Sequence, residues 1–106
     1  MSVIDVLPVE VPTIDPFIAE EARQVLELLR ERGWCKRALV DSEGRMCLLG
    51  AIVVASEGSP DAFSRDQTPL ERVIRKQIPG GMISAWNNTA ERTFEDVEAL
   101  LLEFGA

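Results

Sequence analysis

The eight residues 48–55, Leu-Leu-Gly-Ala-Ile-Val-Val-Ala, are apolar without interruption. A segment that is apolar on every face has to be covered by the rest of the chain on all sides. The chain has 106 residues, enough for one hydrophobic core but not for two independent domains. We therefore expect this segment at the centre of a single domain. Its periodicity leaves helix and strand open; we favour a short helix with Gly50 and Ala51 at a close packing contact, although the β-branched residues that follow favour a strand.

Three longer helices are predicted from start signals and apolar stripes. They span residues 16–32, from 69 to about 78, and from 94 to about 104. Asp15, Thr68 and Thr93 each precede a helix as N-caps. Gly33 is expected to end the first helix as a left-handed cap, and Trp34 to pack back onto its last turn.

The remaining segments are predicted as an arm and a hairpin. Residues 1–15 are apolar but interrupted by two prolines, which is typical of an extended arm that packs on its own domain or docks on another chain. Residues 38–41 and 45–48 flank a short Gly-containing turn and predict a β-hairpin. In the expected register, Asp41 lies opposite Arg45 and forms a cross-strand ion pair.

The predicted fold is therefore mainly α, in the α+β sense, with about four helices around one core and a short β-hairpin after the first helix. Residues 1–15 are the arm and residues 16–106 are a single helical domain. Between the last two long helices, residues 83–86 are expected to form a short apolar turn that leads into an Asn-Asn turn.

Charge and composition exclude several classes of function. With 11 Lys+Arg against 18 Asp+Glu, the net charge of -7 disfavours nucleic-acid binding. No apolar run is long enough to span a bilayer and no secretory leader is apparent, so we expect a cytoplasmic protein without membrane contact. The chain has no histidine, and Cys35 and Cys47 do not form a CxxC pair, so neither a metal nor another cofactor is expected. Both cysteines are interpreted as small buried hydrophobes.

Two groups of residues are candidates for a binding site. Basic residues, including Arg30 and Arg37, gather after the middle of the first helix, whereas the last helix is strongly acidic. Trp86, Asn87 and Arg92 place an aromatic ring, an amide and a guanidinium just before the last helix, where an anion can bind. The alternative is structural: Trp86 fills the core and Asn87 closes a turn.

The order and spacing of several short motifs carry a resemblance. They are Gly33-Trp34-Cys35, Asp41, Gly44, Cys47-Leu48-Leu49-Gly50-Ala51, Trp86-Asn87 and Arg92-Thr93. The chain resembles, over residues 16–104, a family of short, functionally uncharacterised proteins of actinobacteria and their phages. Where that family has Trp-Asn-Asp, this chain has Asn88 in the third position. The resemblance implies no particular activity; a phage origin would make a host-directed binding protein plausible.

The expected function is a small, acidic, non-catalytic protein-binding or regulatory module. Its partner is expected to be a protein, and the arm offers a route to a homo-oligomer. One alternative is a small-molecule or anion-binding enzyme that uses the corner formed by Trp86, Asn87 and Arg92, although catalytic motifs are missing. A second alternative is an acidic mimic of nucleic acid.

Overall fold

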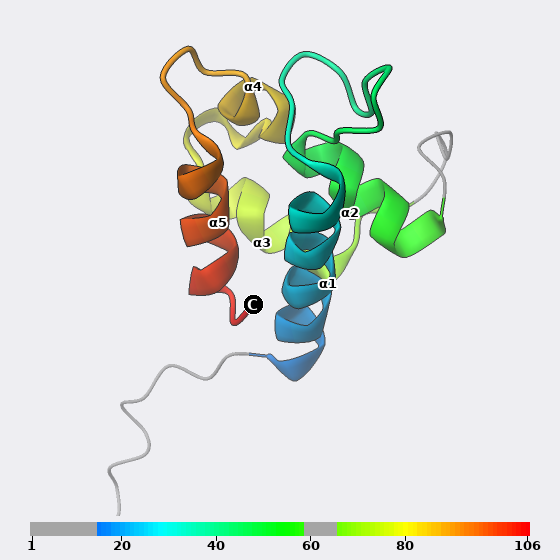
Figure 1. The fold of residues 1–106 in the computed structure, drawn as a ribbon. Helices are drawn as coiled ribbons and strands as arrows, with labels where there is room; N and C mark the ends of the chain where they lie inside the picture. Colours follow the sequence, from blue (N-terminus) through cyan, green and yellow to red (C-terminus); the bar gives the residue numbers. More distant parts are fainter. Residues whose placement is uncertain (1–14, 59–65) are drawn as a thin grey trace, which may run out of the picture.

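The computed structural model describes residues 15–58 and 66–106, so all but the last residue of the predicted arm lies outside the described residues. The helical elements, in chain order, are α1 (Pro16–Arg32), α2 (Leu48–Glu57), α3 (Pro69–Gln77), the 3-10 turn η3 (Pro79–Gly81), α4 (Ile83–Asn87) and α5 (Phe94–Glu103). α1 packs against α2, α3 and α5, and α4 packs against α2. The start of α1 and the end of α5 lie at the same end of the molecule (Figure 1). The mainly helical fold class is confirmed.

α1 has the predicted bounds because both of its ends carry local signals. Asp15 Oδ1 accepts a hydrogen bond from the Phe17 N–H at 2.8 Å, which caps the first turn. At the other end, the N–H of Gly33 donates to Leu29 O at 2.8 Å. The positive φ of Gly33, 95°, was expected, but its ψ of 160° places it outside the left-handed helical region. The predicted left-handed cap is therefore wrong in its exact geometry, although the position still favours glycine.

The central apolar segment is helical, which resolves the ambiguity between helix and strand. Residues 48 and 50–53 of α2 are buried, and Cys47 caps the helix by accepting a hydrogen bond from the Gly50 N–H at 3.3 Å. A Cβ atom added to Gly50 would lie 2.0 Å from Leu39 O. The predicted close contact at Gly50 is thus confirmed, and its partner is the backbone of the loop that precedes α2. Packing on all sides outweighs the modest strand preference of the β-branched residues.

The predicted β-hairpin is wrong, because residues 38–48 contain no strand. Two isolated bridges join Met46 to Val40 and to Trp34. The antiparallel bridge to Val40 keeps the expected register, with hydrogen bonds from the Asp41 N–H to Arg45 O at 2.8 Å and from the Cys47 N–H to Leu39 O at 3.1 Å, but it extends over this one pair only. The other edge of Met46 bonds to the end of α1: its N–H donates to Gly33 O at 2.9 Å and its O accepts from the Cys35 N–H at 3.0 Å. The second strand is also cut short because α2 begins at residue 48.

The tip of the predicted hairpin survives as a tight turn. Asp41 and Arg45 form the expected ion pair, with 2.7 Å between Asp41 Oδ2 and Arg45 Nε. Asp41 Oδ1 also accepts hydrogen bonds from the N–H groups of Glu43 and Arg45, each at 2.9 Å. Burial raises the pKa of Asp41, but the hydrogen bonds from Arg45 and Glu43 outweigh it, and the net pKa lies below the ordinary value.

This lowered pKa predicts acid-sensitive stability at the turn. A carboxyl group with a lower pKa in the folded than in the unfolded state stabilises the fold above the unfolded pKa, and that contribution disappears as the pH falls through the folded pKa. We therefore expect the difference in unfolding free energy between wild type and Asp41→Asn to be largest above about pH 4 and to shrink as the pH falls below that value. Chemical denaturation at a series of pH values measures this difference. Ser42→Ala, at a neutral exposed site in the same turn, should give a difference without pH dependence; the same behaviour in Asp41→Asn would contradict the prediction.

The two later long helices begin at their predicted caps. Thr68 Oγ1 accepts a hydrogen bond from the Glu71 N–H at 3.1 Å. At the start of α5, Thr93 and Asp96 form a reciprocal capping box, with Asp96 in the position where Glu or Gln is usual. Residues 83–86, expected as an apolar turn, form the short helix α4 together with Asn87 instead.

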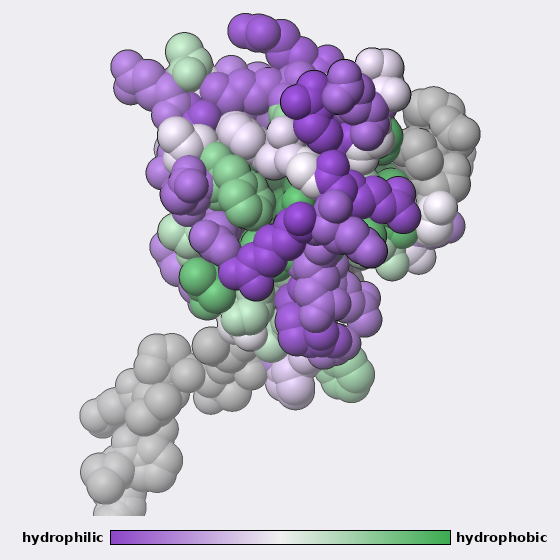
Figure 2. Space-filling model, viewed as in Figure 1, coloured by the Kyte–Doolittle hydropathy of each residue, from purple (hydrophilic) through white to green (hydrophobic). Residues whose placement is uncertain are grey.

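The buried core contains apolar side chains from all five α-helices, together with Met46 and Ile78 from the segments between them. Hydrophilic residues cover most of the face shown in Figure 2, with smaller apolar areas between them. The large apolar side chains that stay exposed include Phe17, Met82 and Leu102. Within the described ranges, no helix is long and apolar enough to cross a membrane.

Candidate binding surface

The end of the molecule opposite to the start of α1 is built from irregular segments. We call it the crown and define it as residues 33–47, α4 and residues 88–92. It occupies the upper end in Figure 1. The sequence places most of its candidate site residues in this region, so the contacts inside the crown decide which of them are free to bind a partner.

Asn87 is the buried centre of the crown, with a fully buried side chain. Its Oδ1 accepts hydrogen bonds from Trp34 Nε1 at 2.6 Å and from the Leu48 N–H at 3.0 Å. Its Nδ2 donates to Cys35 O at 3.1 Å and to Asn88 Oδ1 at 3.2 Å. The amide thus makes all the bonds that two lone pairs and two N–H groups allow. Asn87 joins α4, the loop after α1 and the start of α2, and it has no capacity left for a ligand.

Trp86 and Arg92 lie next to one another, as predicted, but their side chains bind each other rather than a ligand. The Arg92 guanidinium stacks on the Trp86 ring, 3.9 Å from its centroid, and Arg92 Nε donates to Trp86 O at 3.0 Å. Both side chains are half-buried. They border a shallow depression of about 210 Å³ together with Pro79, Ala85 and Thr89. The pair therefore fixes the turn before α5.

Lys36 makes further contacts between two loops of the crown, and the sequence did not indicate them. Its Nζ donates to Thr89 O at 2.9 Å and to Ala90 O at 3.1 Å, and it lies 5.6 Å from the centroid of the Trp34 ring. The loop after α1 and the turn before α5 are thereby tied together. No local pattern signals a lysine that caps carbonyl groups more than fifty positions away.

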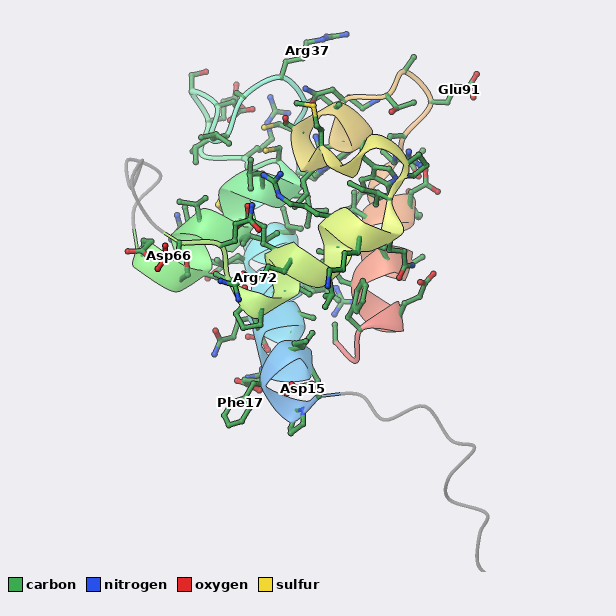
Figure 3. The ribbon with its side chains drawn as sticks, turned by 180° about the vertical axis from the view of Figure 1, so that it is seen from behind. Asp15, Phe17, Arg37, Asp66, Arg72 and Glu91 are labelled. Atoms are coloured by element: carbon green, nitrogen blue, oxygen red, sulfur yellow. The ribbon has the colours of Figure 1, made fainter. Side chains whose placement is uncertain are left out.

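The two predicted basic residues have different surroundings. Arg30 forms an ion pair with Glu98, with 2.5 Å between Nη2 and Oε2, and so links α1 to α5. Arg37 is exposed, and its guanidinium has no ion pair or hydrogen bond with the described part of the chain. Figure 3 shows the Arg37 side chain extending away from the helices. Of the predicted residues in the crown, Arg37 is the one that is presented to solvent.

The backbone of Arg37 is also unusual. Its φ of 69° is positive, which no other non-glycine residue in the described ranges shows. The Arg37 N–H donates to Asn88 Oδ1 at 2.8 Å, so the buried amide of Asn87, through Asn88, supports this conformation. Asn88 was singled out in the sequence only as a departure from a family pattern; here it holds the strained residue in place.

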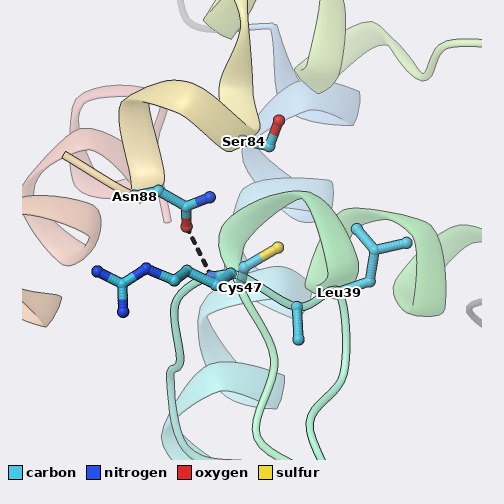
Figure 4. Close-up of a pocket in the computed structure, with 6 residues that line it drawn as sticks. Leu39, Cys47, Ser84 and Asn88 are labelled. Carbon is cyan, nitrogen blue, oxygen red and sulfur yellow. Dashed lines mark hydrogen bonds between the residues drawn. The ribbon is translucent and has the colours of Figure 1, made fainter.

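A small pocket lies beside Arg37 (Figure 4). Its volume is about 220 Å³, and it is lined by Arg37, Ala38, Leu39, Cys47, Ser84 and Asn88. Burial raises the pKa of the Cys47 thiol, and burial together with the nearby Asp41 raises that of Cys35. Both thiols are therefore protonated at neutral pH and weakly nucleophilic. Neither cysteine forms a disulfide, and the described residues contain no cluster of three potential metal ligands.

These features define a small helical domain with a loop-rich end that is held together by buried polar contacts. The chain belongs to a family described as "Family of unknown function (DUF6197)", which matches residues 15–105. This agrees with the expectation of an uncharacterised family over nearly the same range. No curated protein and no solved structure matches the chain.

Proposed function

We propose that this protein is a small, acidic, non-catalytic protein-binding or regulatory module of the cytoplasm, and that it contacts its partner through the crown. The observation that carries this proposal is Arg37, an exposed guanidinium on a positive-φ backbone that the buried polar bonds of the crown hold in place. Strained residues are concentrated at binding and catalytic sites, because an unused strain of about 1 to 3 kcal/mol is easily lost by mutation.

The support behind Arg37 is typical of a binding loop on a rigid scaffold. Asn87 links the crown to the start of α2, and Lys36 links two loops within the crown. The loop that carries Arg37 therefore binds a partner with little loss of conformational entropy. Arginine is also among the residues that most often dominate interface energies. The raised pKa of the Cys47 thiol favours binding over covalent chemistry in the adjacent pocket.

The charge distribution favours an acidic contact area on the partner. The crown contains four basic and three acidic residues, whereas α5 contains four acidic residues and no basic one. An acidic partner would therefore be steered toward the crown and repelled from α5. This arrangement gives less support to an acidic mimic of nucleic acid, whose contact surface would be negative.

The resemblance to proteins of actinobacteria and their phages favours a host-directed role for this binding. The apolar arm at residues 1–15 would add a second contact, either to the partner or to another copy of the chain in a homo-oligomer. Both points are part of the proposal and rest on the sequence.

Arg37→Gly tests the proposal directly. Glycine adopts the same positive φ without strain and keeps the backbone N–H, so the variant removes the guanidinium and should be as stable as wild type or up to about 1 kcal/mol more stable. We expect quantitative affinity capture from native extract to recover the specific partner at least about tenfold less with this variant, with a further decrease at high salt. Arg72→Ala, at an exposed arginine on α3, is the matched control and should leave recovery unchanged. Equal recovery with Arg37→Gly and wild type would overturn the proposal.

A further inference from the structure

The pocket beside Arg37 is lined by hydrogen-bond donors and by no acidic residue. Asn88 Oδ1 is occupied by the Arg37 N–H and by Asn87 Nδ2, so the amide must direct its own N–H₂ group elsewhere. In the described structure, neither this group, the Ser84 hydroxyl nor the Arg37 guanidinium has a side-chain hydrogen-bond partner. Three side chains with free donor capacity therefore border one small cavity.

The lining suits a negatively charged oxygen ligand attached to a short aliphatic chain. A guanidinium, an amide N–H₂ and a hydroxyl all donate to carboxylate oxygens, and the guanidinium also supplies the opposite charge. Ala38 and Leu39 add apolar surface that can contact methylene groups. Arg37 also lines the pocket, and its exposed side chain extends away from the helices in Figure 3, so it would have to turn back to cover an occupied pocket.

The size of the pocket decides what carries the carboxylate. A site for a whole small molecule typically measures about 300 to 1,000 Å³. At about 220 Å³ this pocket is smaller, and it is open to the surface of the crown. These dimensions fit one inserted side chain better than a complete metabolite.

We infer that this pocket is the specificity site of the crown and receives the carboxylate of an aspartate or glutamate side chain of the partner protein. The inference rests on the proposed function and adds the chemistry of recognition. Asn88 and Ser84 bind the carboxylate oxygens, Arg37 covers them, and the apolar wall contacts the methylene groups of the inserted residue.

NMR titration of the full ¹⁵N-labelled chain tests the pocket without knowledge of the partner. Propionate is the probe because it reproduces the end of a glutamate side chain, and propionamide is its neutral isostere. We expect propionate to give saturable shifts at the amides of residues 37–39, 84 and 88, with a dissociation constant in the millimolar range of about 1 to 20 mM. Propionamide should bind at least about fivefold more weakly.

The variant Asn88→Asp places a carboxylate in the pocket and keeps the oxygen that accepts from the Arg37 N–H. It should weaken both propionate binding and partner capture at least about fivefold, because two carboxylates repel one another and the new one attracts Arg37. Gln67→Glu adds the same charge at an exposed residue outside the crown and should change either affinity by less than about twofold.

The outcomes separate this inference from the proposed function. Two results would contradict the carboxylate pocket but not the proposed function. In the first, Arg37→Gly lowers partner capture but Asn88→Asp does not. In the second, propionate and propionamide give equal shifts. Propionate binding that Asn88→Asp abolishes, without any partner that depends on Arg37, would overturn the proposed function and identify a free small acid as the source of the carboxylate.

Discussion

Gly50→Ala is expected to destabilise the protein by about 2 to 4 kcal/mol, although the same change stabilises an ordinary helix position by up to about 1 kcal/mol. The added Cβ would lie 2.0 Å from Leu39 O, 2.7 Å from Leu39 C and 3.1 Å from Leu39 Cα. These atoms belong to the backbone, so no side-chain rotation relieves the overlap. Either α2 moves away from the crown or the loop at Leu39 does, and in both cases packing is lost.

Urea denaturation of Gly50→Ala, monitored by circular dichroism, measures this effect. Gly44→Ala is the matched control: its φ is 85°, but a Cβ there meets no atom within 4 Å, so only backbone strain of about 1 kcal/mol is expected. A Gly50→Ala protein as stable as wild type would show that α2 and the loop are not in the close contact described here.

Asn87→Ala is expected to cost about 3 to 5 kcal/mol of unfolding free energy. The truncation leaves the Leu48 N–H, Trp34 Nε1 and Cys35 O without their partner, and each desolvated polar group costs about 1 to 3 kcal/mol. The small cavity that remains adds to this cost. The penalty exceeds that of an ordinary surface asparagine because the wild-type side chain is fully buried.

Thr89→Ala removes an exposed hydroxyl that donates to Ala85 O and should change stability by about 0.5 kcal/mol or less. Hydrogen exchange adds a local measure: in Asn87→Ala we expect faster exchange at Cys35, Met46 and Leu48 than in wild type, with smaller changes along α5. A loss of less than about 1 kcal/mol, or unchanged protection of the crown, would mean that Asn87 does not hold it together.

The predicted and observed helices agree where the determining contacts are local. Asp15, Thr68 and Thr93 cap helices within three residues of themselves, and the apolar stripes repeat within each helix. The burial of α2 was also predictable, since a segment without a polar face can lie only inside the core. Its helical state was only favoured, because burial on all sides satisfies a helix and a strand equally well.

The structure shows where the candidate site residues lie, and their contacts could not be predicted from the sequence. Trp86 and Arg92 do meet, and Arg37 is exposed, but Asn87 is buried and Arg30 is engaged with α5. The roles of Lys36 and Asn88 and the pocket itself have no local signature.

The amino-acid sequence alone determines the helical class, most helix ends and the apolar centre of this protein. It can do so because capping hydrogen bonds and amphipathic spacing act over one or two helical turns. Packing decides the remainder. The bonds of Asn87 join positions 39 to 53 residues apart, and those of Met46 link the loop before α2 to the end of α1. Buried donors and acceptors must find partners, and which group supplies them depends on the segments that folding brings together.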